Sequence, residues 1–326
     1  MRYRLLGKTK MKISEISLGT WQLGSKWGEE FNEEVALQTL ESAYKEGINC
    51  FDTADIYQDG LSEKVIGKFI KDKKDEIFVI TKCGRKLNPH VAQGYNGVNI
   101  RQFVFSSLEN MQVESLDLVL LHCPPTDVYH SDEAFKVLDD LKTEGKIKNY
   151  GVSVEKVEEA IKALQYDISV VEIIFNMFRL KPSEEFFKLA KEKNVGIIVR
   201  VPLASGLLTG KFNENTKFSK NDHRNYNRNG EAFDKGETFS GVDYNTGLNA
   251  AKEIKEKLQT ENLVHSALKY ILMYDEVSTV IPGASNPKQI ENNAKACDIN
   301  DFTKEQMDIV KDVYERTIKE SVHNLW

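Results

Sequence analysis

The sequence predicts an α/β fold, a (β/α)8 barrel, from the number of its strands and from their apolar character. Eight short β-type segments alternate with helix-type segments along the 326 residues, a pattern typical of a parallel sheet covered by helices. Several segments, such as VGIIV at 195–199, are continuous apolar runs, which suit strands buried on both faces. The predicted strands are 16–19, 49–52, 78–82, 116–122, 149–153, 170–175, 195–200 and 277–281.

A third observation separates the barrel from a doubly wound sheet, which would show the same alternation. A doubly wound nucleotide-binding fold carries Gly-x-Gly-x-x-Gly directly after a strand. None of the 20 glycines has another glycine two positions away, and the sequence has no P-loop. The barrel is therefore favoured, and a nucleotide would have to bind by another route.

The other elements follow in chain order around these strands. Residues 3–14 predict a short hairpin ahead of the barrel. Residues 204–247, rich in glycine, asparagine and charge, predict a long loop after the seventh strand, where barrels commonly carry functional loops. Residues 303–320 predict a terminal helix with Thr303 and Gln306 as its capping box. Capping residues also mark three earlier helix starts, at Ser62, at Ser131 and at Asn286 before Pro287. Because composition shifts nowhere in a linker-like way, we expect one domain over 1–326.

Composition excludes several classes of protein. The chain has 44 Lys and Arg against 50 Asp and Glu, a net charge of −6, and this argues against a nucleic-acid binder. We expect no membrane segment, because no run approaches 18 uncharged apolar residues. The first residues lack the apolar run of a signal peptide. Four cysteines without a CxxC pattern predict neither disulfides nor a metal site, and a cytoplasmic setting is expected.

Four polar residues at or just after separate strand ends form a coherent chemical set, called the tetrad below: Asp52, Tyr57, Lys82 and His122. Barrel active sites lie at the carboxyl ends of the strands. A Lys82 ammonium beside the phenol is expected to lower the pKa of Tyr57 from about 10, so that it can act as a general acid. Asp52 would hold Lys82, and His122 would orient the substrate oxygen. This chemistry suits carbonyl reduction, in which carbon receives a hydride and oxygen a proton.

The chain resembles the aldo-keto reductase family over nearly its whole length. The resemblance is carried, in order, by FDTADIY, VITK, LLHCP, GVS, PLASGLLTGK and IPGASNP. It implies a (β/α)8 barrel that binds NADPH or NADH without a Rossmann motif and acts on a small carbonyl substrate. It also implies Tyr57 as proton donor, Lys82 and Asp52 as the residues that tune it, and His122 as the substrate-orienting group. We expect NADPH, with NADH as the alternative.

The resemblance implies three groups of cofactor-binding positions. Those near the nicotinamide are Gly19, Thr20, Trp21, Ser153, Glu172 and Arg200. Those covering the pyrophosphate are Leu203, Ser205, Gly206, Leu208 and Lys211. Those at the adenosine end are Gly283, Ser285, Lys288, Gln289, Asn292 and Asn293.

The chain departs from the family pattern at three of the positions near the nicotinamide. Val154 stands where the family has Asn, Glu172 where it has Gln, and Arg200 where many members stack an aromatic ring. A carboxylate can accept from the amide of the nicotinamide but cannot donate to it unless protonated. An Arg200–Glu172 ion pair is expected to moderate both charges.

Other hypotheses stay open from the sequence. The protein could be a nicotinamide-binding regulatory or sensor subunit with little turnover, or a barrel hydrolase that uses Asp52 and Asp55 as paired carboxylates. Cys83 and Cys123 could form a redox or metal cluster, although packing residues are the simpler interpretation. Candidates for lining an apolar substrate pocket are Trp21, Trp27, Tyr95 and Phe178. Neither the substrate nor the oligomeric state follows from the sequence.

Overall fold

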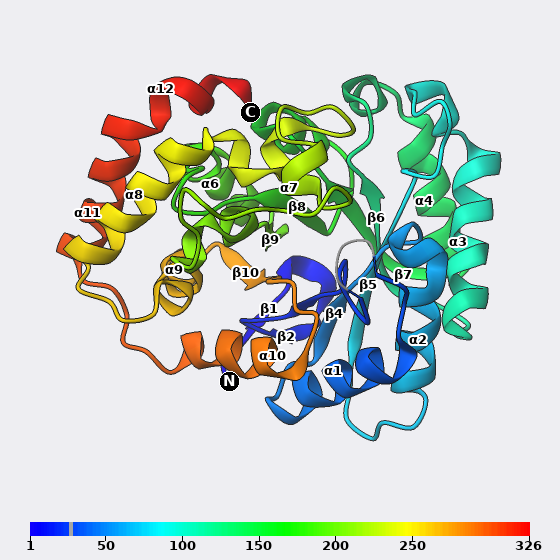
Figure 1. Cartoon of the computed structure of the whole chain (residues 1–326). Helices are drawn as coiled ribbons and strands as arrows, with labels where there is room; N and C mark the ends of the chain where they lie inside the picture. The colour runs from blue at the N-terminus through cyan, green and yellow to red at the C-terminus, as the bar shows by residue number, and fades with distance from the viewer. Residues whose placement is uncertain (26–28) are drawn as a thin grey trace.

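A closed ring of parallel strands is the centre of the molecule (Figure 1). The structure, a computed structural model, describes residues 1–25 and 29–326. Within this part of the chain, eight parallel strands pair in sequence order, and the bridges Ile16 to Val280 and Gly19 to Gly283 join the first strand to the last. The predicted (β/α)8 barrel is therefore confirmed. The strands are β3 (Leu18–Gly19), β4 (Cys50–Asp52), β5 (Phe78–Cys83), β6 (Leu116–His122), β7 (Ile147–Ser153), β8 (Val170–Ile174), β9 (Gly196–Arg200) and β10 (Val277–Val280).

Helices surround the barrel on the outside (Figure 1). They are α1 (Glu33–Lys45), α2 (Leu61–Ile70), α3 (Gly97–Met111), α4 (Glu133–Thr143), α5 (Val157–Ala163), α6 (Phe186–Glu192), α9 (Leu263–Leu272) and α10 (Pro287–Ala294). Asn286 caps α10 as predicted, because its side chain accepts from the backbone N–H of Gln289. The starts predicted at Ser62 and Ser131 are wrong by one or two residues.

The two misplaced starts have different physical reasons. Gly60, at φ 85°, precedes α2, so Ser62 already lies inside that helix. The Ser62 hydroxyl instead bonds Thr20 Oγ1 and Thr53 Oγ1, each at 2.9 Å, which ties α2 to the loops after β3 and β4. Ser131 lies one residue before Asp132, which is the residue that precedes α4.

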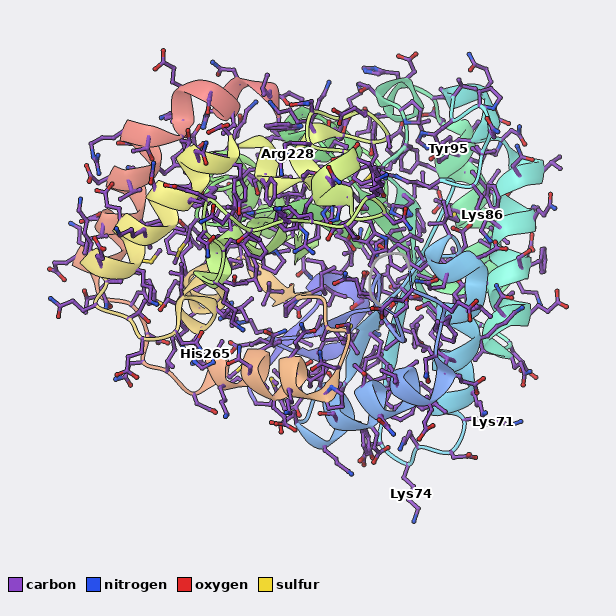
Figure 2. The ribbon with its side chains drawn as sticks, in the orientation of Figure 1. Lys71, Lys74, Lys86, Tyr95, Arg228 and His265 are labelled. Atoms are coloured by element: carbon purple, nitrogen blue, oxygen red, sulfur yellow. The ribbon has the colours of Figure 1, made fainter. Side chains whose placement is uncertain are left out.

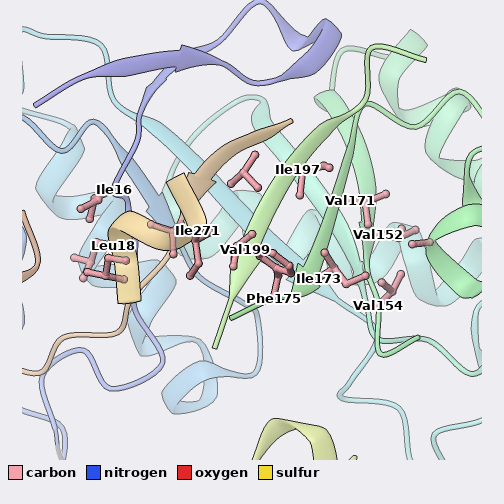
Figure 3. Close-up of a cluster of buried hydrophobic side chains, with 14 of the residues drawn as sticks. Ile16, Leu18, Val152, Val154, Val171, Ile173, Phe175, Ile197, Val199 and Ile271 are labelled. Carbon is pink, nitrogen blue, oxygen red and sulfur yellow. The ribbon is translucent and has the colours of Figure 1, made fainter. Parts of the chain in front are cut away.

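Side chains on the strands alternate between two apolar layers, as the two-residue period of a strand requires. Outward-facing residues such as Val171 and Ile173 of β8 pack with helix residues such as Ile271 of α9 (Figure 3). Inward-facing residues such as Ile80 and Leu120 fill the interior of the barrel. Both layers are buried, which explains why the strands read as continuous apolar runs.

The predicted hairpin closes one end of the barrel interior. β1 (Tyr3–Leu5) and β2 (Lys12–Ser14) pair antiparallel. Leu6, Met11 and Ile13 pack into the same cluster as the interior strand residues. Because these side chains fill that end, the ionisable groups collect at the other one.

The segments beyond the eight βα units partly follow the prediction. The terminal helix α11 (Lys304–Thr317) has the predicted capping box of Thr303 and Gln306, and a short helix, α12 (Lys319–Val322), follows it. Residues 204–247 form no strand, but they include α7 (His223–Tyr226) and the start of α8 (Tyr244–Lys257). No helix in the described part of the chain is long and apolar enough to cross a membrane.

Candidate active site

On five strands, the row of side chains that faces the barrel interior ends in an ionisable residue. Each of these side chains lies two residues after an interior apolar residue, and so points to the same side of its strand. The pairs are Cys50 with Asp52, Ile80 with Lys82, Leu120 with His122, Val170 with Glu172, and Ile198 with Arg200. The alternation that builds the core therefore also delivers these groups to one end of the barrel.

The structure brings the four tetrad residues together. Lys82 Nζ lies 2.5 Å from Asp52 Oδ1 and donates to the Thr53 carbonyl at 3.1 Å. The same Nζ lies 5.4 Å from the centre of the Tyr57 ring. The rings of Tyr57 and His122 meet edge to face with their centres 6.0 Å apart. Phenol, ammonium and imidazole are thus in one group, as the sequence predicted.

The expected lowering of the pKa of Tyr57 is wrong for this structure. Burial raises the pKa of the Tyr57 phenol above its usual value, and the neighbouring Lys82 ammonium only opposes that rise. Burial also acts to lower the pKa of Lys82, but Asp52 and Glu172 outweigh it and raise that pKa. Tyr57 is therefore a protonated phenol beside a charged ammonium at neutral pH.

His122 is neutral in this environment. The residue is 8% exposed, and its Nδ1 has no hydrogen-bond partner among the described residues. Burial lowers the pKa of the imidazole well below its usual value, and the positive charges of Arg85 and Lys82 lower it further. A neutral imidazole keeps one N–H to donate and one lone pair to accept with.

Arg200 has a different principal partner from the one expected. Its Nη2 lies 2.9 Å from Glu155 Oε2 and donates to the Val154 carbonyl at 3.0 Å. Its Nε lies 4.0 Å from Glu172 Oε1, at the limit of an ion pair. Glu172 Oε1 instead accepts from Ser153 Oγ at 3.0 Å. The predicted Arg200–Glu172 pair is therefore present, but it is longer than the Arg200–Glu155 pair.

Sequence reasoning missed three charged residues around Arg200. Arg85 Nη2 lies 2.9 Å from Glu155 Oε1 and 2.7 Å from Glu237 Oε1, and Arg200 Nη1 is 3.6 Å from Glu237. Glu155 continues the inward row of β7 two residues after Ser153, so the strand period could have indicated it. Glu237 is 37 residues beyond β9, and no local pattern indicates its place.

Cys123 lies against the same charged group. Cys123, Glu155 and Glu237 each offer a ligand atom within 4.8 Å of the others. Arg200 Nη2, however, donates to Cys123 Sγ at 3.5 Å and to Glu155. The two guanidiniums of Arg85 and Arg200 supply the positive charge that a metal ion would bring. Cys83 is buried and is a packing residue of the outer layer.

The long segment after β9 covers the ring of Trp21. The Trp21 ring stacks on Tyr57 at 6.4 Å, and the rings of His223 and Phe233 approach it at 5.2 and 6.1 Å. Burial lowers the pKa of His223 to about 4, so this ring is neutral. Trp21 therefore lies between the tetrad and the covering segment, as expected of a residue that lines the site.

The other described pocket candidates, Tyr95 and Phe178, are both buried in the outer apolar layer. Tyr95, on the loop between β5 and α3, bonds His90 Nε2 at 2.8 Å and lies on the same side of the molecule as Lys86 (Figure 2). Phe178 is fully buried in the outer apolar layer, so it is a core residue. Trp27 lies outside the described residues.

Several of the implied cofactor positions are already bonded within the protein. Thr20 is buried and donates to the Asp52 carbonyl at 2.8 Å. Ser205 Oγ donates to the Glu237 carbonyl at 2.9 Å and accepts from the backbone of Phe239. These two residues shape the loops of the site. Leu203 is partly buried and Leu208 is buried.

The adenosine-end positions lie at the start of α10 and beside it. Gln289 Oε1 accepts from the Ser285 backbone at 2.8 Å. Asn292 Oδ1 accepts from Asn262 at 3.1 Å and lies 3.2 Å from His265 Nε2, which Figure 2 shows next to α10. Asn293 is buried, whereas Lys211 and Lys288 are exposed.

The strand ends beside α10 leave room for a ligand. A side chain built on Gly283 would meet only the Gly19 carbonyl, at 4.0 Å, so the space above this glycine is open. Gly206, at φ 102°, has a backbone conformation that other residues rarely adopt. An open glycine next to the N-terminus of an eight-residue helix suits an anionic group. The residues present therefore fit a nicotinamide dinucleotide.

Comparison with known proteins assigns the chain to a family. Residues 15–315 match the model of the aldo/keto reductase family. The chain belongs to this family. Aldo-keto reductases are oxidoreductases of small carbonyl compounds that generally use nicotinamide cofactors, so the hypothesis of a barrel hydrolase is set aside.

Curated and solved relatives agree with the family. The chain is 30% identical over 94% of its length to "Uncharacterized oxidoreductase YqkF" of Bacillus subtilis (strain 168), and covers 94% of that protein. It is 25% identical to "NADH-specific methylglyoxal reductase" of Escherichia coli (strain K12), over 90% of this chain and 93% of the other. It is also 26% identical to "Probable voltage-gated potassium channel subunit beta" of Arabidopsis thaliana, over 92% of each. The holo form of aldo-keto reductase AKR11C1 from Bacillus halodurans superposes with a TM-score of 0.77, at 28% identity and 96% coverage of both chains.

Proposed function

We propose that the protein reduces an aldehyde or ketone to an alcohol with NADPH, with Tyr57 as the general acid. The observation that carries this proposal is the grouping of Tyr57, Lys82 and His122 at one end of the barrel, with Asp52 bonded to Lys82. The four groups come from the ends of three neighbouring strands, because Asp52 ends β4 and Tyr57 follows it, while Lys82 and His122 lie on β5 and β6. Each has a distinct task in the reaction.

The chain's own residues would bind and polarise the carbonyl and deliver its proton. The neutral His122 donates to the carbonyl oxygen and orients it beside the Tyr57 hydroxyl. A bound reduced nicotinamide supplies the hydride that the carbonyl carbon receives. As negative charge develops on the oxygen, Tyr57 gives up its proton, and Lys82 stabilises the phenolate that remains. A proton from solvent then restores the phenol.

The raised pKa of Tyr57 is compatible with this direction of reaction. A reductase needs a phenol that is protonated before the chemical step, and burial keeps it so. The ammonium at 5.4 Å then favours loss of the proton only when the substrate oxygen can take it. Alcohol oxidation, which starts from the phenolate, should need higher pH.

The proposed cofactor residues are the three groups named from the family resemblance. Ser153 and Glu172 would face the carboxamide, Ser205 and Gly206 the pyrophosphate, and α10 the adenosine end. Lys288 in the first turn of α10 supports NADPH over NADH, because it can meet the additional phosphate. The Escherichia coli relative named for NADH keeps NADH as the alternative.

Titration of the protein with NADPH and with NADH, followed by tryptophan fluorescence, tests the choice of cofactor. Trp21 stacks on Tyr57, so a cofactor bound there should quench it. We expect tighter binding of NADPH, and loss of that preference in Lys288→Ala. Equal affinity for both cofactors in the unchanged protein would contradict the choice.

A regulatory nicotinamide-binding subunit is the second candidate, and the relative named as a potassium channel subunit supports it. The presence of all four tetrad residues favours a reductase over a regulatory subunit. Steady turnover on a panel of aldehydes distinguishes the two: a reductase turns over many times per cofactor-binding site, whereas a sensor retains its cofactor with negligible turnover. We propose that either function belongs to one domain spanning the chain.

A further inference from the structure

Lys82 is bonded by two carboxylates from different parts of the barrel. Asp52 Oδ1, on the neighbouring strand β4, lies 2.5 Å from Lys82 Nζ. Glu172 Oε2, on β8 three strands along the barrel, lies 3.4 Å from the same nitrogen. The Lys82 side chain is 0% exposed and each carboxylate side chain 2%. Two buried acids thus face one buried ammonium.

The two acids place two carboxyl groups around one ammonium in a buried site, so the charges balance only if the pair holds one proton. Burial raises the pKa of the Asp52 carboxyl well above its usual value, and the nearby Glu172 carboxylate adds to the rise. Two ionised carboxylates facing a single ammonium would leave one buried negative charge uncompensated, which is costly away from water. Asp52 Oδ2 and Glu172 Oε2 accept no hydrogen bond within the described residues, so apart from the ion pairs with Lys82 no donor compensates these two oxygens.

We propose that Glu172 is a positioning residue that acts as a second counter-ion for Lys82 and shares one proton with Asp52. This inference deepens the proposed function and rests on it. With both acids present, the pair carries one negative charge, which balances the ammonium. If either acid is removed, the other remains as the counter-ion and keeps Lys82 charged and in place. Glu172 acts on Tyr57 through Lys82, and Ser153 Oγ fixes it by donating to Oε1 at 3.0 Å.

The other charged groups around the pair leave this balance intact. Arg200 on β9 lies 4.0 Å from Glu172, but its closer partner is Glu155. His122 on β6 is neutral, and Glu237 from the covering segment is bonded by Arg85. Lys82 is therefore the cation that depends most directly on Asp52 and Glu172.

A double-mutant cycle of Asp52→Asn and Glu172→Gln tests the inference. Each single variant should lower kcat by less than about tenfold, because one carboxylate remains. The double variant leaves a buried ammonium without a counter-ion and should lose at least about a hundredfold. Asp52→Asn with Glu155→Gln is the matched control, since Glu155 is a largely buried acid that contacts Arg200 and Arg85 and not Lys82. In that control the fold-losses in kcat of the two single variants should multiply in the double variant.

Unfolding of the cofactor-free protein in urea gives a readout that does not depend on turnover. Burial raises the pKa of Asp52 in the folded state, and Glu172 adds to the rise, so the folded protein keeps a proton that the unfolded chain releases near pH 4. The associated stability is present below that pH and is lost as pH rises through the folded pKa. Above pH 5 the urea midpoint of the unchanged protein should therefore fall more steeply with pH than that of either single variant.

The outcomes separate this inference from the proposed function. If Asp52→Asn alone loses as much activity as the double variant, or if the two effects multiply as in the control, Glu172 is no counter-ion. If the pH dependence of the urea midpoint is the same in all variants, the shared proton is absent. If the double variant does not fold while both single variants and the control do, the result also supports the inference, because Lys82 then needs at least one of the two acids for folding. If Tyr57→Phe keeps its turnover, the proposed mechanism fails, while the urea measurements still test the pairing with Lys82.

Discussion

The Arg200 guanidinium bonds Glu155 at 2.9 Å, and this contact joins the end of β9 to the loop after β7. Arg85 bonds the same carboxylate and also Glu237 in the long segment. These four residues form a largely buried network of alternating charge beside the tetrad. The network fixes the covering segment to the barrel at a place where an aromatic ring is common in the family.

Removing Arg200 should destabilise the protein, because Glu155 and Glu237 then share the guanidinium of Arg85 in place of two guanidiniums. Arg200→Met should lower the free energy of unfolding by about 3 kcal/mol, the usual cost of breaking a buried ion pair from one side. Urea unfolding at pH 7 measures it. The combination with Glu155→Gln should recover part of the loss. A cost below about 1 kcal/mol for Arg200→Met would show that the network contributes little.

Trp326 should anchor the covering segment. Its indole donates to Asp234 Oδ1 at 2.8 Å, its ring lies under the Arg179 guanidinium at 4.4 Å, and Gly241 leaves no room for a side chain against it. Trp326→Ala should cost about 3 kcal/mol and expose the segment to protease. Leu325→Ala is the control, because Leu325 is 49% exposed. Equal proteolysis of the two variants would contradict this role.

Asp55 should make stability depend on pH. Its carboxyl is 2% exposed, and burial together with the Glu63 carboxylate raises its pKa to about 7. A folded pKa above the unfolded value near 4 means that stability is full below pH 4 and is lost as pH rises through 7. Asp55→Asn should therefore be more stable than the unchanged protein at pH 8, by a few kcal/mol at most, and should lose this advantage near pH 4.

Thermal unfolding across this pH range measures the effect of Asp55. Asp59→Asn serves as the control, because the Asp59 side chain is 98% exposed. If Asp55→Asn and Asp59→Asn follow the same pH profile, the pKa of Asp55 is not raised in the folded protein.

His122 should not titrate near neutral pH. Burial and the charges of Arg85 and Lys82 hold its pKa well below the usual value. The imidazole proton resonance of His122, assigned with His122→Gln, should stay constant from about pH 6 to pH 8. A midpoint near the ordinary histidine value of about 6.5 would contradict the neutral donor proposed for the substrate oxygen.

The barrel and the inward positions of Asp52, Lys82 and His122 were predictable because they depend on local periodicity, whereas Tyr57 lies in the turn after β4 and came from the family resemblance. Cys50 and Asp52, or Ile80 and Lys82, are two residues apart on single strands, so facing inward is a property of each strand by itself. The hairpin that closes one end and the capping box of α11 are equally local. The family resemblance then linked the strand ends to carbonyl chemistry.

What the sequence could not predict depends on distances between remote segments. Glu237 meets Arg85, 152 residues away along the chain, and Trp326 meets Asp234, 92 residues away. The sign of the pKa shift at Tyr57 depends on whether burial or Lys82 is stronger, which only the packed structure decides. Ser62 is a residue type that often caps helices. The sequence does not reveal that its hydroxyl bonds Thr20, because this contact joins residues far apart in the chain.

The most direct test of the proposed mechanism is Tyr57→Phe, measured for kcat with a good aldehyde and for the dissociation constant of NADPH. The substitution removes the phenolic proton and keeps the ring that stacks on Trp21. We expect kcat to fall by about 10²- to 10⁴-fold, the usual contribution of a general acid, while the dissociation constant changes by less than about twofold. A variant that keeps full turnover with unchanged cofactor binding would contradict Tyr57 as the proton donor.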